Sequence, residues 1–198
     1  MLLKGHGRIT PGFITERMLE DRFTEAEIVR GCQQNERKYQ EVLYRRFART
    51  MYGVCLGYAA DRSQAQDILH EAFLKIFKGM GEFRGEGSLE GWIRRIVTRT
   101  AIDQFRKDRR IGHYIEEHQE APPGEVPENT LGQLQVKDIL KQVARLPEGA
   151  RTIFNLFALE GYTHKEIALE LDISEGTSRS QYYRARSLLM AWLKDKRT

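Results

Sequence analysis

Apolar residues recur at spacings of three and four along almost the whole chain, and this pattern restricts the fold to helices. No segment shows the strict alternation of apolar and polar residues that marks a half-buried strand. We therefore expect an all-α protein. Two stripes illustrate the pattern, one after Asn35 and one after Asp61. The first contains Tyr39, Val42, Leu43, Phe47, Met51, Val54 and Cys55, and the second contains Ala65, Ile68, Leu69, Ala72, Phe73, Ile76 and Phe77.

Residues that cap helices precede most of the amphipathic segments. Thr24 with Glu27 and Thr163 with Glu166 both match the capping box, which predicts a helix through about Gln34 and another after Thr163. Glycines make 78–88 a predicted loop, and the next helix should run through about Lys107. Further caps are expected at Asn35, Asp61, Ser88 and Ser174, and Pro147 is expected at the first helical position.

The segment 113–130, HYIEEHQEAPPGEVPENT, divides the chain into two parts. It contains three of the five prolines, several glutamates and little to bury, so it predicts a flexible acidic linker, with an ordered loop as the alternative. We expect two small helical domains joined by this linker. The predicted divisions are an N-terminal extension 1–22, a domain 23–110, the linker 111–130 and a second domain 131–198.

The segment THKEIALELDISEGTSRSQYYRARS, 163–187, predicts a helix-turn-helix. A short helix is followed by a tight turn at Asp172 and a longer helix over 175–193, and the small Ala168 suits a close helix crossing. Tyr182, Ala185, Leu189 and Trp192 should face inward on the second helix. Arginines on its other face could then reach the major groove of DNA. A plain helical hairpin with solvated arginines is the alternative interpretation.

The helix after Ser88 combines a basic strip with an aromatic residue. Arg95, Arg99 and Arg106 lie away from the predicted buried face of Ile93, Ile96, Val97, Ala101 and Phe105, and Trp92 stands at one end of the strip. An aromatic ring beside a basic groove suits single-stranded DNA, because bases stack while phosphates are neutralised. The alternative is that Trp92 belongs to the hydrophobic core.

Several functional classes find no support in the sequence. No nucleophile has a suitable base and no phosphate-binding loop is present, so we do not expect an enzyme or a bound cofactor. The two cysteines, Cys32 and Cys55, lie far apart, and His113 with His118 makes a poor metal site. No segment resembles a signal peptide or a membrane span, so we expect a cytoplasmic protein without membrane insertion.

Two separate segments resemble bacterial RNA polymerase sigma factors of the extracytoplasmic-function type. The C-terminal segment resembles their fourth conserved region through Leu146-Pro147, Glu166-Ile167-Ala168, Ile173-Ser174, Gly176-Thr177, Ser180 and Arg184-Ala185-Arg186. It differs at Ser178, where the family usually has a small apolar residue, and at Gln181, where it usually has a basic one. The segment 61–110 resembles the second conserved region through Ala65, Asp67, Glu71, Phe73, Phe83-Arg84-Gly85, Trp92, Ile96, Ile102-Asp103 and Arg106.

This resemblance implies a function in transcription initiation, with core RNA polymerase (its clamp helices and flap) and both double- and single-stranded promoter DNA as partners. An anti-sigma factor is a further partner that the family implies. The residues implied at the minus-thirty-five element are Thr163, Lys165, Glu175, Thr177, Arg179, Ser180, Tyr183, Arg184 and Arg186. Those implied at the minus-ten element are Phe83, Arg84, Ser88, Trp92, Arg95, Thr98, Arg99 and Arg106. Those implied at core polymerase are Asp67, His70, Glu71 and Lys75, which would otherwise form a solvated face.

Two other functions stay open from the sequence alone. A stand-alone helix-turn-helix regulator would bind DNA without the polymerase. A nucleic-acid-processing enzyme with an unrecognised site is the weaker alternative.

Overall fold

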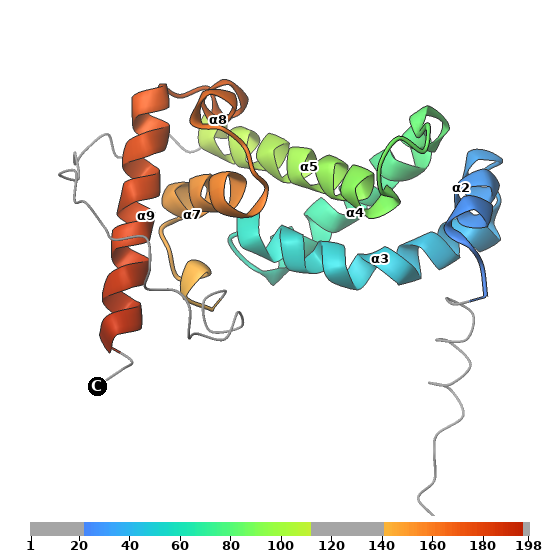
Figure 1. Cartoon of the computed structure of the whole chain (residues 1–198), viewed down its shortest axis with the longest axis horizontal. Helices are drawn as coiled ribbons and strands as arrows, with labels where there is room; N and C mark the ends of the chain where they lie inside the picture. Colours follow the sequence, from blue (N-terminus) through green and yellow to red (C-terminus); the bar gives the residue numbers. More distant parts are fainter. Residues whose placement is uncertain (1–21, 112–140, 196–198) are drawn as a thin grey trace, which may run out of the picture.

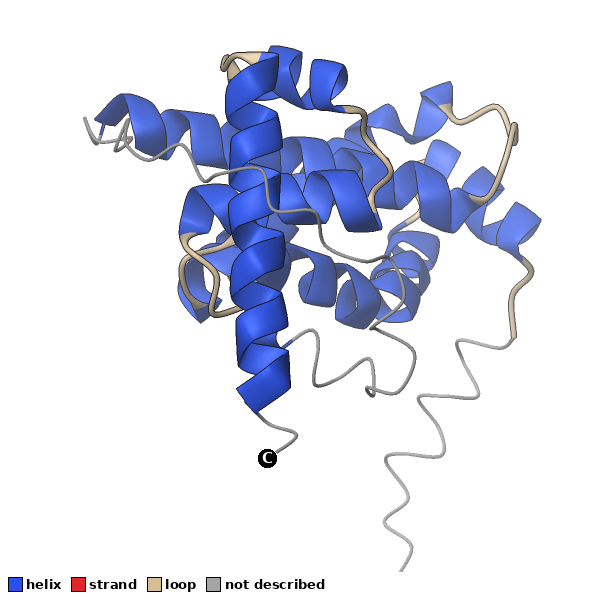
Figure 2. Cartoon of the chain, turned by 60° about the vertical axis from the view of Figure 1, so that its left-hand side comes forward, coloured by secondary structure: helices blue, strands red, loops and turns tan. Residues whose placement is uncertain are grey.

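The computed structural model describes residues 22–111 and 141–195, and within these ranges every regular element is a helix (Figures 1 and 2). This confirms the predicted all-α fold. The N-terminal domain contains α2 (Glu25–Gln33), α3 (Arg37–Tyr58), α4 (Arg62–Gly79), the 3₁₀ turn η1 (Met80–Glu82) and α5 (Leu89–Ile111). The C-terminal domain contains α7 (Glu148–Phe154), the π-helical turn η2 (Asn155–Leu159), α8 (His164–Leu171) and α9 (Glu175–Asp195).

Most of the predicted caps are confirmed. Both capping boxes form, with the Thr24 and Thr163 side chains accepting from the backbone N–H three residues on. Asp61 accepts from the Gln64 N–H at 2.9 Å at the start of α4. Ser88 and Ser174 accept in the same way from the Gly91 and Thr177 N–H groups, at 3.1 and 2.9 Å. These bonds satisfy N–H groups that have no partner inside the helix.

Four local predictions were wrong. Asn35 does not cap α3, because it has a left-handed backbone with φ of 58° and Glu36 is the N-cap residue. Pro147 is the N-cap residue of α7 and does not lie inside the helix. The segment 78–88 is only partly a loop, since α4 continues to Gly79 and η1 follows with a buried Met80. The helix after Ser88 extends four residues beyond the predicted Lys107, to Ile111.

The core of the N-terminal domain lies between α3, α4 and α5. Both predicted stripes face it: Leu43, Met51 and Cys55 on α3, and Ala65 and Ile76 on α4, are fully or almost fully buried. On α5, Ile93, Val97, Ala101 and Phe105 complete it, as predicted, with Ile96 partly buried. Tyr39 and Phe77 pack at its edge.

The C-terminal domain has a small core of its own. Val143, Leu146 and Ala150 meet Ala185 and Leu189 of α9, with Trp192 packed against them. The turn between α8 and α9 has Asp172 in a left-handed conformation, φ 55° and ψ 51°, which Asp adopts more readily than most residues. The predicted helix-turn-helix is therefore present.

The two domains pack directly against each other (Figure 1). In Figure 1, α7 lies beside the C-terminal end of α3, and α9 lies on the opposite side of α7. Ile153 and Leu156 of the α7–η2 segment and Ile167 and Leu171 of α8 belong to the same apolar cluster as the core of α3, α4 and α5. One continuous core therefore joins segments that are far apart in the sequence.

Some predictions fall outside the described residues. These are the extension 1–22 except for its last residue, the linker 111–130 except for its first residue, and the parts 131–140 and 196–198 of the second domain. None of the described helices is both long enough and apolar enough to cross a membrane.

Candidate nucleic-acid interface

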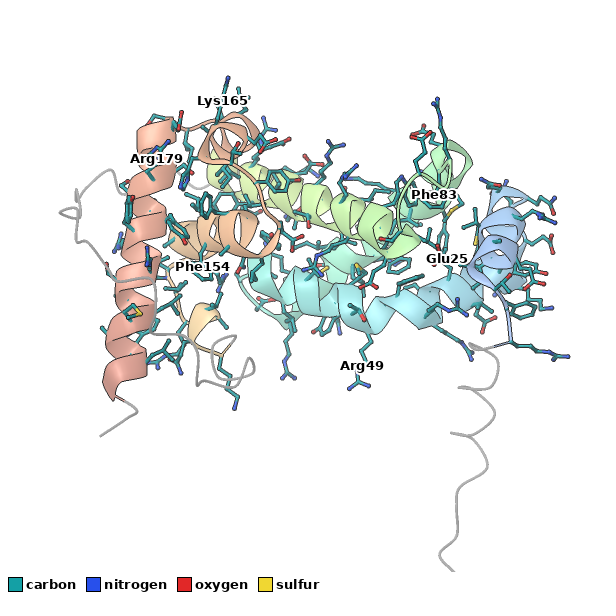
Figure 3. All side chains as sticks on the ribbon, in the orientation of Figure 1. Glu25, Arg49, Phe83, Phe154, Lys165 and Arg179 are labelled. Atoms are coloured by element: carbon teal, nitrogen blue, oxygen red, sulfur yellow. The ribbon has the colours of Figure 1, made fainter. Side chains whose placement is uncertain are left out.

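The N-terminal part of α9 carries the exposed basic face expected of a recognition helix. Arg179 and Tyr183 are exposed, while Ser180, Arg184 and Arg186 are partly exposed. Arg179 forms an ion pair with Glu175 one turn earlier, and both side chains are accessible. Figure 3 shows Arg179 and Lys165 near one another at the same end of the C-terminal domain. The structure thus brings α8 and α9 residues of the predicted set together.

The contact between α8 and α9 includes an unexpected polar pair. Ser178 is completely buried, and its Oγ lies 2.9 Å from His164 Nδ1. The His164 ring stacks on Phe157, with a centroid distance of 4.3 Å and an interplanar angle of 14°. Burial lowers the pKa of His164, and Arg179 lowers it further against the opposing effect of Glu175. His164 therefore supplies the partner that a polar residue needs at this buried position.

The basic strip of α5 faces the C-terminal domain. Arg95 and Arg99 are exposed, and they line a groove of about 530 Å³ together with Arg94. The opposite wall of the groove belongs to 160–162 and α8, and it includes Glu160, Glu166, Leu169 and Glu170. Arg106, near the C-terminal end of α5, is partly exposed.

Arg94 and Glu160 join the two walls of this groove. Arg94 Nε donates to Glu160 Oε2 at 2.8 Å and Arg94 Nη2 donates to Glu160 Oε1 at 2.9 Å. The bidentate bond raises the pKa of Arg94. The Glu160 side chain is only 9% exposed, so the ion pair is shielded on its acidic side. Bidentate arginine–carboxylate pairs of this kind are geometrically specific.

Trp92 and the adjoining loop form the other end of the strip. The Trp92 ring is partly buried against Phe83, with centroids 5.4 Å apart. Phe83 itself is buried, whereas Arg84 and Ser88 on the loop are exposed. Figure 3 shows Phe83 at the end of the molecule opposite to Arg179. Thr98 differs from the arginines of α5 in the same predicted set, because it is only 1% exposed.

The exposed face of α4 carries the remaining predicted set. Asp67 and His70 are exposed, while Glu71 and Lys75 are partly buried and form an ion pair with an N–O distance of 3.0 Å. Lys75 also reaches Asp103 of α5 at 3.3 Å. Burial lowers the pKa of Lys75, but the bonds to both carboxylates outweigh burial and raise it.

Two features of these surfaces were missed in the sequence. Leu74 is 48% exposed on α4 beside the predicted polar residues, and its position outside the buried stripe was an available signal. Glu160 was also missed, because its partner Arg94 lies 66 residues away and no local pattern connects them. No group of three or more metal-ligating side chains occurs within the described residues.

Comparison with known proteins gives a consistent result. Residues 43–111 match the family described as Sigma-70 region 2, and residues 137–189 match Sigma-70, region 4. RNA polymerase sigma-H factor of Pseudomonas aeruginosa is 26% identical over 83% of this chain and 91% of its own length. The ECF RNA polymerase sigma-E factor of Haemophilus influenzae is 27% identical over 86% of this chain and 96% of its own.

A solved structure is also similar in part. The sigma factor RpoE of Bartonella quintana, in complex with the anti-sigma factor NepR, has a TM-score of 0.45 at 20% identity over 78% of this chain and 96% of that one. The two family matches follow one another in the order of the two helical domains. The chain belongs to the extracytoplasmic-function family of RNA polymerase sigma factors, and it directs the polymerase in promoter recognition.

Proposed function

We propose that this sigma factor uses one surface for each of its three macromolecular contacts. The N-terminal domain, assigned to 23–110, binds core polymerase and the minus-ten element, and the C-terminal domain, assigned to 131–198, binds the minus-thirty-five element. The observation that carries this proposal is that α5 and α9, in different domains, each present exposed arginines. One chain can therefore contact DNA at two separated sites.

The minus-thirty-five contact is assigned to the start of α8 and the first half of α9. Arg179, Tyr183 and Arg184 would enter the major groove, since α9 is a continuous helix with these side chains on its accessible face. An arginine can donate two hydrogen bonds to a guanine edge. Thr163, Lys165, Glu175, Thr177, Ser180 and Arg186 complete the assigned set.

The minus-ten contact is assigned to α5 and the preceding loop. Arg95, Arg99 and Arg106 would neutralise phosphates of the melted strand, and Trp92 would offer a ring for base stacking. Gly85 and Gly87 have φ of 76° and 92°, conformations that give the loop its shape beside Trp92. Phe83, Arg84, Ser88 and Thr98 complete the set.

The polymerase contact is assigned to α4. Asp67, His70, Glu71 and Lys75 would meet the clamp helices, and exposed Leu74 adds an apolar centre to this face. A patch of charged residues around one large apolar side chain is typical of protein interfaces. The C-terminal domain would contact the flap of the polymerase. The protein would act in the cytoplasm, and an anti-sigma factor would be a further partner.

Promoter-dependent transcription with purified core polymerase tests this assignment. Arg179→Ala with Arg184→Ala should weaken binding of a duplex upstream element by about tenfold or more per lost base contact, while binding to core is retained. Charge reversal of Asp67 and Glu71 should weaken binding to core polymerase, while binding to the duplex upstream element is retained. Arg49→Ala, which removes an arginine that points away from both DNA surfaces in Figure 3, is the control.

The alternative function predicts a different result. A stand-alone regulator would bind duplex DNA without binding core or directing initiation. Unchanged core affinity after reversal of both carboxylates would contradict the assignment of α4.

A further inference from the structure

We propose that His164 positions the two helices of the helix-turn-helix for duplex DNA, through a hydrogen bond to Ser178 that fixes the start of α8 against the first turns of α9. Its side chain would act through Lys165 and Arg179 and would not bind the DNA itself. This role rests on the minus-thirty-five contact proposed above, and His164 lies outside the set of residues predicted for that contact.

The ring of His164 joins α8 to two neighbouring elements. It stacks on Phe157 of η2 with a centroid distance of 4.3 Å, and it meets Tyr182 of α9 edge-on at 5.7 Å. Its Nδ1 lies 2.9 Å from the Oγ of Ser178, one turn before Tyr182. Because His164 is the first residue of α8, these contacts hold the beginning of that helix on α9.

The same contacts determine how α9 is rotated about its own axis. Successive residues of an α-helix point in directions about 100° apart, so the residue after an inward-facing one turns to an adjacent side. Ser178 and Tyr182 face His164. The residues directly after them, Arg179 and Tyr183, are exposed. The side chains proposed to enter the major groove therefore lie beside the part of the helix that His164 holds.

One hydrogen bond links the direct neighbours of two DNA-facing residues. Lys165 follows His164 in the chain, and Arg179 follows Ser178. Figure 3 shows Lys165 and Arg179 near one another at the same end of the C-terminal domain. Phosphate contacts fix the register of a protein on the duplex, while base contacts read the sequence. Both kinds of contact can form together only if α8 and α9 keep their relative position.

A hydrogen bond specifies this position more closely than an apolar contact would. It weakens steeply when donor and acceptor are misaligned. Ser178 is completely buried, so a movement of α8 that broke the bond would leave its hydroxyl unsatisfied. The small apolar residue that sigma factors usually have at this place carries no such penalty. The serine therefore restricts the helix pair to one arrangement.

The charge of His164 allows positioning to be separated from direct binding. Burial lowers the pKa of His164 below 6.5, and Arg179 lowers it further against the opposing effect of Glu175. At pH 8 the imidazole is therefore neutral, and its replacement by a phenyl ring removes no charge. A change in the number of phosphate contacts after this replacement must come from displaced neighbours such as Lys165.

Fluorescence anisotropy of the full chain at pH 8, over a series of salt concentrations, measures the role. The probe is a short labelled DNA duplex, selected by the wild type from a random pool. His164→Phe keeps a ring beside Phe157 but loses the hydrogen bond, and it should bind about three- to tenfold more weakly. The slope of log K against log salt should become shallower by about one, as expected for one lost phosphate contact.

Further variants separate the hydrogen bond from the ring. Ser178→Ala removes the same bond from the other helix, so it should have both effects, and the double variant should bind no more weakly than either single one. His164→Asn, whose amide takes the place of Nδ1, should restore the wild-type slope. Ser63→Ala removes an exposed hydroxyl from α4 in the other domain and is the control. All proteins are compared well below their melting temperatures, where lost stability alone changes neither quantity.

The outcomes distinguish this role from the function on which it rests. A His164→Phe protein with the salt slope of the wild type, or single losses that add in the double variant, would overturn the role of His164. Lys165→Ala and Arg179→Ala test the minus-thirty-five assignment separately, and that assignment fails if neither weakens binding. If both weaken binding and His164→Phe does not, the assignment stands and only the positioning role is refuted.

Discussion

Ser178 shows how one polar residue is accommodated where sigma factors usually have a small apolar one. Its side chain is completely buried, and its Oγ lies 2.9 Å from His164 Nδ1. The serine therefore does not simply weaken the packing of α8 on α9, as its polarity alone would suggest. His164 and Ser178 therefore form a pair in which each side chain supplies the hydrogen-bond partner of the other.

The pair predicts the effect of Ser178→Ala. Loss of one hydrogen bond should reduce the free energy of unfolding by about 0.5–1.5 kcal/mol, because the His164 ring keeps some access to water and can find another partner. Urea unfolding of the full chain measures this. Ser187→Ala, on the exposed side of α9, is the matched control, and an equal loss in both variants would contradict the role of the pair.

His164 also predicts a dependence of stability on pH. Its pKa in the folded protein is lowered below the usual 6.5, first by burial and then by Arg179. Below about pH 6.5 the unfolded chain therefore binds more protons than the folded one, and the free energy of unfolding decreases as the pH is lowered. The capping carboxylates Glu27 and Glu166, whose pKa values are lowered below 4.5, stay ionised over this range.

Thermal unfolding between pH 7.5 and 5.5 measures the effect. The melting temperature of the wild type should fall over this interval by more than that of His164→Gln, which keeps a polar group without a titrating ring. Parallel curves for the two proteins would show that His164 does not contribute.

At the scale of the element, the start of each helix was predictable wherever a capping side chain lies within three residues of its partner. Thr24, Asp61 and Thr163 are local signals of this kind, and all three form the expected bonds. Met80 gave no such signal: it lies in η1 between Gly79 and Gly81, and it is buried where η1 packs against α2, which is far away in the sequence. Asn35 was misassigned, since a capping residue and a left-handed turn residue share the same preference for Asn.

The turn between α8 and α9 gives a prediction at this scale. Asp172 has φ of 55°, which costs residues other than glycine about 1–2 kcal/mol unless local hydrogen bonds compensate. Asp172→Ala should therefore destabilise the C-terminal domain by about 1 kcal/mol, while Asp172→Gly should be tolerated. Circular dichroism during urea unfolding can compare the two, and an alanine variant as stable as the glycine variant would exclude strain at this turn.

At the scale of the whole molecule, the two domains were predictable and their docking was not. Leu146-Pro147, Trp92 and the arginines of α5 and α9 lie in short motifs that identify each domain. The contacts that join the domains involve Arg94 with Glu160, Arg151 with Ala59 and Asn155 with Gly57, pairs 66 to 98 residues apart. No periodicity or cap encodes such pairs.

The docking predicts that the two domains unfold together. Arg151 is buried, burial lowers its pKa, and it donates to the carbonyls of Ala59 in one domain and Ala144 in the other. Arg151→Ala should lower the free energy of unfolding by about 1.5–3 kcal/mol per charged hydrogen bond lost, and it should separate a single calorimetric transition into two.

Arg145→Ala is the control, because Arg145 bonds to Gln142 and lies over the Trp192 ring within its own domain. The control should lower the temperature of the single calorimetric transition without dividing it into two. If Arg151→Ala still unfolds in one transition at a lower temperature, the prediction of two transitions is wrong. The shared apolar core of Ile153, Leu156 and Ile167 is then sufficient to make the two domains unfold together. In that case Arg151 determines how the domains are oriented and not whether they unfold cooperatively.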